Sequence, residues 1–530
     1  MSSDFTPSPQ QAAIFDWVRN GTGSALVVAV AGAGKTTTLV QAVKHMRGSV
    51  FLGAYNSAIA KELKGRIEGL LSVRAGTFHS AGFRAWMRVA NRCVVEERKG
   101  AMIFDKLLAD GRARDHEFTF ALKLASLAKQ SAVGVLWDGR DLGAWRDIVD
   151  HHDLAYDLAG ADGSIEEGVV DRAIEAARNV VRESIKLNRD MIDYDDMIYA
   201  PLLHNVPMWP QDWVLIDEAQ DTNAARRALA KKMLRPGGRL IAVGDPRQAI
   251  YGFTGADSDS MDIIKREFNC VELPLTVTYR CPKVVVSFVQ RWVSHIQAHE
   301  SAPEGVLRTI DTDTFMRSEG AGPGDVVLCR NVKPLVALAY ALIREGRPCH
   351  VEGREIGKGL VALVNRWKIK TLAALVDRLT KFREKEVEKF KAAGKEAKAA
   401  AIDDKVETLL VIIERLQATG KRAVSDLIEF IGTLFADTDP NNPASTLVLS
   451  TVHKSKGREW DRVYLLGRTA LMPSPWARQD WQMLQEDNLC YVAGTRSKRE
   501  LVEVALLVPK NSVTPAPDKG RRKKDVATAA

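Results

Sequence analysis

The sequence contains few cysteines and no long hydrophobic run. Its six cysteines are spread over 530 residues with no close pair, which argues against a disulfide framework and a cysteine-based zinc site. This usage predicts a reducing compartment such as the cytoplasm. No apolar run approaches the ~20 residues that span a bilayer. The N-terminus lacks a basic segment followed by an apolar one, so we expect neither a secretory signal nor a membrane partner.

Basic residues exceed acidic residues only slightly. The net charge is +8 and the pI about 9.0, which in a chain of this length is a mild indication of a polyanionic partner. Hydrophobic residues make up 46% and charged residues 27%, as in soluble globular proteins. Because such a chain is too long for one core, we expect roughly three or four compact units.

Short apolar runs alternate with helical segments in both halves of the chain. The strand candidates are 24–30, 50–55, 213–221 and 239–245, and then 324–331, 446–453, 461–467 and 501–508. This alternation predicts an α/β fold with two parallel sheets. Residues ~88–185 and ~356–440 are predicted to be helical. The second segment is rich in Ala, Lys and Glu, and we interpret it as a solvated helix or helical hairpin rather than a DNA-binding one.

The stretch AVAGAGKT, residues 29–36, fits a phosphate-binding loop, with Ala29 where the strict pattern has Gly. Gly32 and Gly34 let backbone N–H groups approach phosphates at a helix N-terminus. Lys35 is expected to reach the β- and γ-phosphates, and the Thr36 hydroxyl to ligate Mg²⁺. A glycine-rich turn that binds nothing is the alternative, but the position between a strand and a helix favours a nucleotide.

The stretch VLIDEAQD supplies carboxylates that such a loop requires. Asp217 is expected to hold Mg²⁺, directly or through water. Glu218 can polarise the attacking water as a general base. An acidic cap on a strand is the alternative for this pair when it is considered without the loop.

The stretch GDPRQAIYGF, residues 244–253, places an amide and two aromatic rings at the end of a strand. Gln248 would share a sheet edge with Lys35 and could contact the γ-phosphate and the water together. Tyr251 and Phe253 offer ring faces on which bases of single-stranded nucleic acid can stack. The alternative is that both rings belong to the core.

Together these segments resemble superfamily 1 DNA helicases of the UvrD/PcrA/Rep type. The resemblance is carried further by TPSPQQAAI, AYNSAIAKEL, TFHSAGF, IDYDDMI, TYRCP, TVHKSKGREWD and YVAGTRSKREL, in the family's order. The sequences AGAGKTTTL and YNSAIA most resemble those of phage-encoded and F-box-type relatives. The resemblance implies an α/β fold with two RecA-like motor domains of the P-loop NTPase type, interrupted by helical inserts.

The resemblance also implies a division of the chain. The first motor domain would comprise 1–88 and 186–283 around a helical insert at 89–185, the second would comprise 284–355 and 441–509 around a short accessory insert at 356–440, and 510–530 would be a disordered basic tail.

The resemblance assigns several residues to the nucleotide. Gln10 would read adenine and Tyr279 would stack on it, while Glu459 would pair with ribose or order the Lys456–Gly457 turn. Arg280 and Arg496 would stabilise the charge that develops on the γ-phosphate. Because Arg496 lies in the second sheet, its contact is expected only when the domains close. The remaining nucleotide contacts would come from the loop itself, through Ala29, Gly32, Ala33, Gly34 and Thr37, the last standing where many relatives carry Arg.

The implied DNA contacts lie in both motor domains. They are Tyr55, Asn56, Thr77, His79, Tyr251 and Phe253 in the first, and Arg330, Asn331, Thr451 and His453 in the second.

The implied function is that of an ATP- and Mg²⁺-dependent DNA helicase in replication, recombination or repair. It would move 3′→5′ on single-stranded DNA and act at single-strand/duplex junctions, with replication or repair proteins as partners. The implied location is the cytoplasm of a bacterial or phage-infected cell, at the nucleoid. Two alternatives stay open: a translocase that displaces bound proteins without unwinding, and a nucleotide-dependent switch without motor output, whose ATP hydrolysis would ignore DNA.

Overall fold

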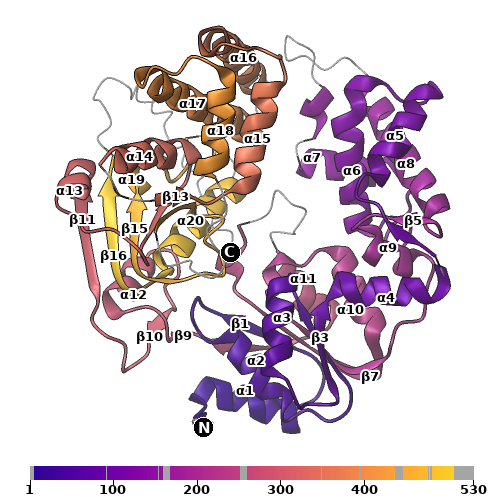
Figure 1. Ribbon diagram of the computed structural model, residues 1–530. Coiled ribbons are helices and arrows are strands. Elements are labelled where there is room, and N and C mark those ends of the chain that lie inside the picture. The colour runs from indigo at the N-terminus through magenta and orange to yellow at the C-terminus, as the bar shows by residue number, and fades with distance from the viewer. Residues whose placement is uncertain are drawn as a thin grey trace, which may run out of the picture.

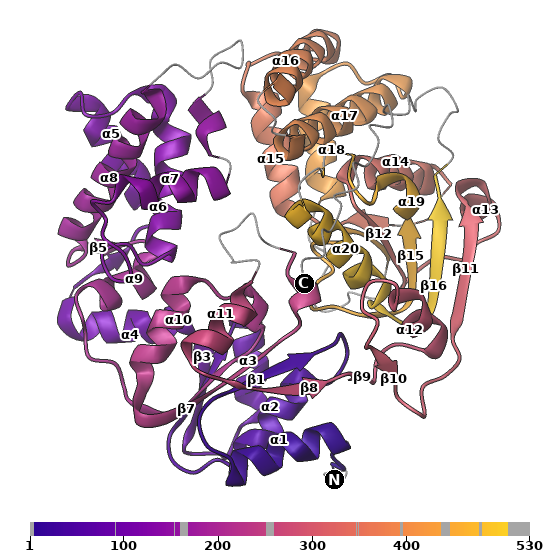
Figure 2. The same cartoon turned by 180° about the vertical axis from the view of Figure 1, so that it is seen from behind.

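The computed structural model describes residues 5–506 apart from 91, 153, 159–167, 251–258, 346, 348, 393–395, 436–445, 476 and 478–479. The predictions for Tyr251, Phe253 and the tail 510–530 therefore lie outside the described residues. The described chain forms two six-stranded parallel sheets and two groups of helices, seen from opposite sides in Figures 1 and 2. The predicted α/β class with helical inserts is confirmed.

The first sheet has the strand order β3-β2-β6-β7-β1-β8, and all its pairs are parallel. Its strands are β1 (Ala25–Ala29), β2 (Val50–Ala54), β3 (Val73–Thr77), β6 (Gln211–Ile216), β7 (Leu234–Gly244) and β8 (Val271–Leu275). The helices around it are α1 (Pro9–Asn20), α2 (Lys35–Val43), α3 (Ser57–Arg66), α4 (Phe78–Ala90), α9 (Asp196–Leu203), α10 (Ala224–Met233) and α11 (Ser260–Glu267). The inner strands are apolar on both sides because helices cover both faces: Val27 of β1 joins the core under α1–α3, and Leu26 joins the core under α10 and α11. We call this sheet with its helices the first α/β unit.

Four helices between α4 and α9 form a separate layer with its own core, at the upper right of Figure 1. They are α5 (Lys99–Ala109), α6 (Phe118–Gln130), α7 (Leu142–His151) and α8 (Val169–Leu187). Two short parallel strands, β4 (Val94–Val95) and β5 (Met191–Ile192), pair where the chain enters and leaves this layer. A buried ion pair between Lys99 Nζ and Asp196 Oδ2, at 2.7 Å, ties α5 to α9.

The second sheet has the order β11-β16-β15-β12-β14-β13 and is also parallel throughout. Its strands are β11 (Val306–Asp311), β12 (Val326–Cys329), β13 (Cys349–Val351), β14 (Leu447–Thr451), β15 (Trp460–Leu466) and β16 (Ser497–Ala505). Its helices are α12 (Lys283–Val289), α13 (Thr312–Arg317), α14 (Val332–Arg344), α19 (Arg468–Leu471) and α20 (Asp480–Gly494). We call this group the second α/β unit.

The accessory insert consists of α15 (Arg354–Asn365), α16 (Leu372–Ala392), α17 (Glu396–Ala418) and α18 (Val424–Leu434). Helices α16 and α17 pack against each other, as expected of a hairpin, and α17 also packs on α14. Leu379 and Ile412 are fully buried in the same core cluster as Val327 of β12. The hairpin is therefore solvated on one side only, and its other side extends the core of the second α/β unit.

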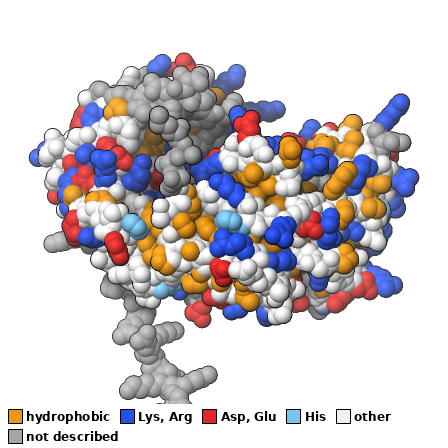
Figure 3. Space-filling view, turned by 90° about the horizontal axis from the view of Figure 1, so that it is seen from below, with side chains coloured by type: hydrophobic (Ala, Val, Ile, Leu, Met, Phe, Trp, Pro, Cys, Tyr) orange, Lys and Arg blue, Asp and Glu red, His pale blue; other side chains and the backbone are white. Residues whose placement is uncertain are grey.

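The two α/β units meet along their facing helices and loops. One cluster of buried residues runs from Val30 and Ala31 in the first unit to Tyr491 and Val492 in the second. The face that includes α1, seen from below in Figure 3, mixes basic, acidic and apolar side chains, in line with the modest net charge of +8. The contact between the units lies beside the carboxyl ends of β1, β6 and β7, where the sequence predicts the nucleotide site.

Candidate active site

The predicted phosphate loop connects β1 to α2. Gly32 and Gly34 have φ angles of +71° and +77°, in the left-handed region that glycine adopts without strain. A Cβ on Gly32 would lie 2.5 Å from Cβ of Arg280, so glycine also permits a close approach of the chain after β9 (Val277–Thr278). Gly34 caps α2 without any side-chain hydrogen bond, which leaves the N-terminal N–H groups of this helix for an anion.

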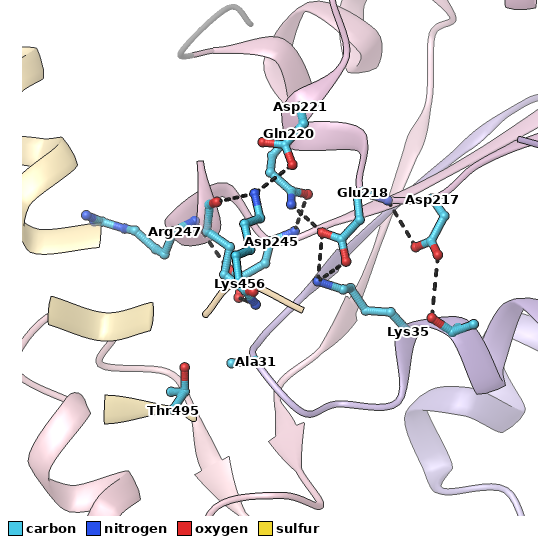
Figure 4. Close-up of polar contacts among 12 residues, drawn as sticks. Ala31, Lys35, Asp217, Glu218, Gln220, Asp221, Asp245, Arg247, Lys456 and Thr495 are labelled. Atoms are coloured by element: carbon cyan, nitrogen blue, oxygen red, sulfur yellow. Dashed lines mark hydrogen bonds and ion pairs between the residues drawn. The ribbon is translucent and has the colours of Figure 1, made fainter. Parts of the chain in front are cut away.

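Lys35 and Thr36, the first residues of α2, face the acidic pair that follows β6 (Figure 4). Lys35 Nζ lies 3.4 Å from Glu218 Oε1, and the Thr36 hydroxyl lies 3.4 Å from Asp217 Oδ2. Burial alone would lower the pKa of Lys35, but the carboxylates of Glu218, Asp245 and Asp217 raise it. The structure therefore brings the predicted lysine, hydroxyl and carboxylates together.

Glu218 has a strained backbone and a firmly held carboxylate. Its φ of +52° is unusual for a residue with a side chain, and such strain is concentrated at functional sites. Gln220 donates a hydrogen bond to the carboxylate from its side-chain amide. Burial would raise the pKa of Glu218, but Lys35 and Lys456 outweigh it and hold the pKa below its usual value. Asp217 differs, because burial and the charge of Glu218 raise its pKa.

Gln248 lies in a 3-10 turn, Pro246–Gln248, directly after β7. Its side-chain amide donates to Asp245 Oδ2 at 2.7 Å, and Asp245 Oδ1 accepts from the backbone N–H of Arg247. Asp245 in turn donates its backbone N–H to Gln220 Oε1 at 3.0 Å. The turn that carries Gln248 is thus linked through Gln220 to Glu218.

The second α/β unit delivers two cations to this place. Arg496 is completely buried, and its Nη2 lies 3.5 Å from Gln248 Oε1. Lys456 Nζ donates to Asp221 Oδ2 at 2.6 Å and to the Gln248 carbonyl at 2.7 Å (Figure 4). Burial and the nearby charge of Arg280 lower the pKa of Arg496 to about 10, so it stays charged at neutral pH. Arg496 thus reaches the predicted γ-phosphate sensor of the first unit, while its contact with the phosphate stays a prediction.

Arg280 is held by partners from the second unit. Its Nε donates to Glu459 Oε2 at 2.6 Å and its Nη1 to the Thr495 carbonyl at 3.3 Å. Glu459, predicted to pair with ribose or order a turn, is therefore placed on Arg280.

The residues predicted to hold adenine lie beside β9. Gln10 forms two hydrogen bonds with Thr276. Its Nε2 donates to Thr276 Oγ1 at 2.8 Å, and its Oε1 accepts from the Thr276 backbone N–H at 2.9 Å. Tyr279 is 47% exposed, and its ring lies against His299 with ring centroids 4.7 Å apart. Thr37 Oγ1 lies 3.5 Å from a guanidinium nitrogen of Arg66 on α3, which brings an arginine near the position where many relatives carry one.

Of the first-unit residues predicted to contact DNA, the four that the structure describes cluster at the ends of β2 and β3. Asn56 and Thr77 cap the following helices, accepting hydrogen bonds from Ile59 N and Ser80 N. Tyr55 and His79 both lie near Arg226, which the sequence analysis did not single out.

Arg226 on α10 lies between these two DNA-track candidates. Its guanidinium is 5.0 Å from the centroid of the Tyr55 ring, and its Nη1 donates to the Asp221 carbonyl at 3.3 Å. Burial and the charge of Arg226 lower the pKa of His79 to about 4, so this imidazole is neutral. In the sequence, the one feature that could have pointed to Arg226 is its place in the helix that follows the acidic pair.

The second-unit candidates lie at the ends of β12 and β14. Arg330 donates to Glu486 Oε1 from both Nε and Nη2, at 3.0 and 2.8 Å. Burial and Arg330 lower the pKa of His453 to about 3. Thr451 ends β14 and is 8% exposed, whereas Asn331, which follows Arg330, is half-buried.

Lys456 and Tyr491 are the other residues that sequence reasoning missed. Both lie inside quoted segments, TVHKSKGREWD and YVAGTRSKREL, but neither was assigned a role. Among the described residues, no group of three or more His, Cys, Asp or Glu side chains is arranged to hold a metal ion. No helix in the same part of the chain is long and apolar enough to cross a membrane.

Comparison with known proteins agrees with this site. Two family models match: the UvrD/REP helicase N-terminal domain over residues 9–269, and the UvrD-like helicase C-terminal domain over residues 276–505. The ATP-dependent DNA helicase PcrA of Staphylococcus epidermidis is 24% identical over 310 residues, which covers 54% of this chain and 40% of the relative. Rep of Escherichia coli is 24% identical over 303 residues, with 52% and 41% covered, and its DNA helicase IV is 26% identical over 339 residues, with 55% and 47% covered.

The chain thus covers less than half the length of these relatives. The family models nevertheless extend over both α/β units and both helical groups. The chain therefore belongs to the UvrD/Rep helicase family.

Proposed function

We propose that this chain is an ATP-driven motor that moves along single-stranded DNA and separates duplex DNA. One observation carries the proposal: side chains from both α/β units converge on one nucleotide site. Lys35 and Glu218 come from the first unit, and Arg496 approaches Gln248 to 3.5 Å from the second. A site shared in this way ties hydrolysis to the relative position of the two units, which is what a motor requires.

ATP would bind with its phosphates at the N-terminus of α2. Thr36 and Asp217 offer a hydroxyl and a carboxylate oxygen 3.4 Å apart, a donor set that suits Mg²⁺. The ion would neutralise phosphate charge and orient the triphosphate when bound. Glu218, kept ionised by the cations around it, would accept a proton from the attacking water, and Arg496 would stabilise the charge that develops.

Single-stranded DNA would cross the carboxyl ends of both sheets. Tyr55, His79 and Arg226 would contact it in the first unit, together with Asn56 and Thr77. Thr451 and His453 would contact it in the second, together with Arg330 and Asn331. The two neutral imidazoles and the half-buried ring of Tyr55 favour stacking and hydrogen bonding, while Arg226 adds a cation for phosphate.

The finer assignments extend the same proposal. The two motor domains would follow the boundaries given above, with 89–185 and 356–440 as their inserts. Movement would run 3′→5′, and the preferred substrate would be a single-strand/duplex junction. Replication or repair proteins would be the partners, in the cytoplasm of a bacterial or phage-infected cell and at its nucleoid.

The test is ATP-driven strand separation on two partial duplexes, one with a 3′ single-stranded tail and one with a 5′ tail. We expect unwinding from the 3′ tail only, and none with Lys35→Ala. Unwinding from the 5′ tail alone would refute the polarity. ATP turnover stimulated by DNA without any unwinding would support a translocase, and turnover indifferent to DNA would support a switch.

A further inference from the structure

Tyr491 reaches from α20 of the second α/β unit into the phosphate loop of the first. Its side chain is fully buried. Its hydroxyl accepts a hydrogen bond from the backbone N–H of Ala31 at 2.8 Å and donates one to Asp245 Oδ2 at 3.1 Å. One phenol therefore joins the loop before α2 to the turn after β7, although it belongs to neither.

The acceptor of the Tyr491 hydroxyl also holds the predicted γ-phosphate sensor. Asp245 Oδ2 receives a second hydrogen bond, at 2.7 Å, from the side-chain amide of Gln248. Removing the Tyr491 hydroxyl would leave this oxygen with a single side-chain donor and would leave the Ala31 N–H buried without its partner. Both losses act on groups that surround the phosphates in the proposed function.

The surroundings keep the hydroxyl protonated. Burial, and then the negative charge of Asp245, raise the pKa of Tyr491 well above its ordinary value. A protonated phenol can donate to Asp245 and accept from Ala31 at the same time. The two bonds are therefore compatible with each other at any pH at which the enzyme would work.

Other contacts of the second unit hold the same turn by its main chain. Lys456 donates to the Gln248 carbonyl, and Asn488 Nδ2 donates to the Ala249 carbonyl at 3.0 Å. These contacts fix where the turn lies. Tyr491 acts on the Asp245 carboxylate, which sets where the Gln248 amide points.

We propose that Tyr491 is a positioning residue. Its hydroxyl aligns the phosphate loop and Gln248 only when the two α/β units are in contact. The inference rests on the proposed function, since it concerns the same ATP site. Tyr491 would not touch the reacting atoms. It makes closure of the units a condition for productive geometry, in addition to the cation supplied by Arg496.

The test is Tyr491→Phe, which removes one oxygen and keeps the shape of the ring. We expect kcat for ATP turnover on single-stranded DNA to fall about tenfold or more, the effect of losing a hydrogen bond that matters mainly in the aligned state. The Kd for ATP should stay within about twofold, and the affinity for ADP with aluminium fluoride should fall along with kcat. The control is Tyr464→Phe, which removes another fully buried tyrosine hydroxyl, one that contacts Arg462 in the second sheet.

A second variant tests the route through Asp245. If Tyr491 acts in part by way of this carboxylate, Asp245→Asn and Tyr491→Phe together should slow turnover by clearly less than the product of the two single effects, because only the bond to Ala31 is then left to lose. Independent, multiplying effects would overturn the proposal. So would a Tyr491→Phe enzyme that matches the wild type, or one in which ATP affinity falls as much as kcat, because the hydroxyl would then only support the fold of the loop.

The two proposals fail in different ways. A wild-type protein whose ATP turnover ignores DNA would refute the proposed function whatever Tyr491 does. A wild type stimulated by DNA, with a Tyr491→Phe variant stimulated equally, would refute only the role of Tyr491.

Discussion

The two α/β units share a six-stranded parallel architecture but carry opposite charge at the edges that face each other. The first unit contributes carboxylates after β6 and β7, namely Asp217, Glu218, Asp221 and Asp245, whereas the second contributes Lys456 and Arg496. Most of these groups are buried, and buried charges need opposite charges close by. The carboxylates of the first unit and the cations of the second therefore depend on each other. Two similar sheets can thus form one site, because one supplies most of its negative charge and the other supplies positive charge. The site is complete only when the units are in contact.

The largest expected effect removes the cation at the start of α2. Lys35→Ala should reduce ATP turnover at least about 10³-fold, because it removes the predicted contact of the loop with the β- and γ-phosphates. Binding to single-stranded DNA should persist, since the DNA candidates lie on other loops. Steady-state ATPase and fluorescence anisotropy measure the two effects, with Lys44→Ala at the exposed end of α2 as the control. Retained turnover would refute the phosphate loop assignment.

The next effect removes the buried cation of the second unit. Arg496→Ala should lower DNA-stimulated turnover by about 10²- to 10³-fold while ATP still binds, because Arg496 acts on charge that develops during hydrolysis. Arg496→Lys should recover only a fraction, since lysine lacks the planar fork that also bonds the Val492 and Arg458 carbonyls. Single-turnover kinetics with an independent ATP-binding measurement separates the steps. Equal losses in binding and turnover would place Arg496 in the scaffold instead of the site.

The same comparison shows what the sequence could reveal about the fold. Every inner strand of both sheets was predicted, since strands covered on both faces need continuous apolar runs such as ALVVA in β1. The four strands of these two sheets that were missed, β3, β8, β11 and β13, all lie at sheet edges. An edge strand tolerates polar residues and proline, as Arg74 in β3 and Pro274 in β8 show.

The site was predictable where a residue type and its neighbours along the chain define the chemistry. Lys35, Thr36, Asp217, Glu218 and Gln248 were named from local stretches and are found together. Three residues were missed because their partners lie far away along the chain. Lys456 is 235 positions from Asp221, and Tyr491 is 460 positions from Ala31. Arg226 is 171 positions from Tyr55 (226 − 55 = 171). No local pattern carries that information. The pairing of Glu459 with Arg280 was missed for the same reason.

A smaller effect distinguishes two arginines among the proposed DNA contacts, one in each unit. Arg226 is held by a carbonyl oxygen and an aromatic ring, whereas Arg330 is already paired with the buried carboxylate of Glu486. Arg226→Gln should therefore reduce the slope of log K against log salt for single-stranded DNA by about 0.7, the value for one phosphate contact. Lys231→Gln, at an exposed position of α10, is the matched control and should leave the slope unchanged.

Arg330→Gln completes the arginine comparison. Because Glu486 already neutralises Arg330, the salt slope should stay nearly unchanged even though Arg330 lies among the proposed DNA contacts. The melting temperature should fall instead, since Glu486 would remain buried without its cation. A reduced slope for Arg330→Gln together with an unchanged slope for Arg226→Gln would reverse the assignment of the phosphate contact.

The smallest effect concerns two neutral histidines, one in each unit. Burial and neighbouring arginines lower the pKa of His79 to about 4 and that of His453 to about 3. In the unfolded chain both would take up a proton near the ordinary pKa of about 6.5, so stability should fall as pH drops below that value. Each histidine should cost about 1 kcal/mol between pH 7 and 5.5. Urea unfolding at both pH values should show that His79→Gln and His453→Gln each remove about that much of the pH dependence. If only one variant had this effect, the other imidazole would be solvated, and the two units would differ at this position.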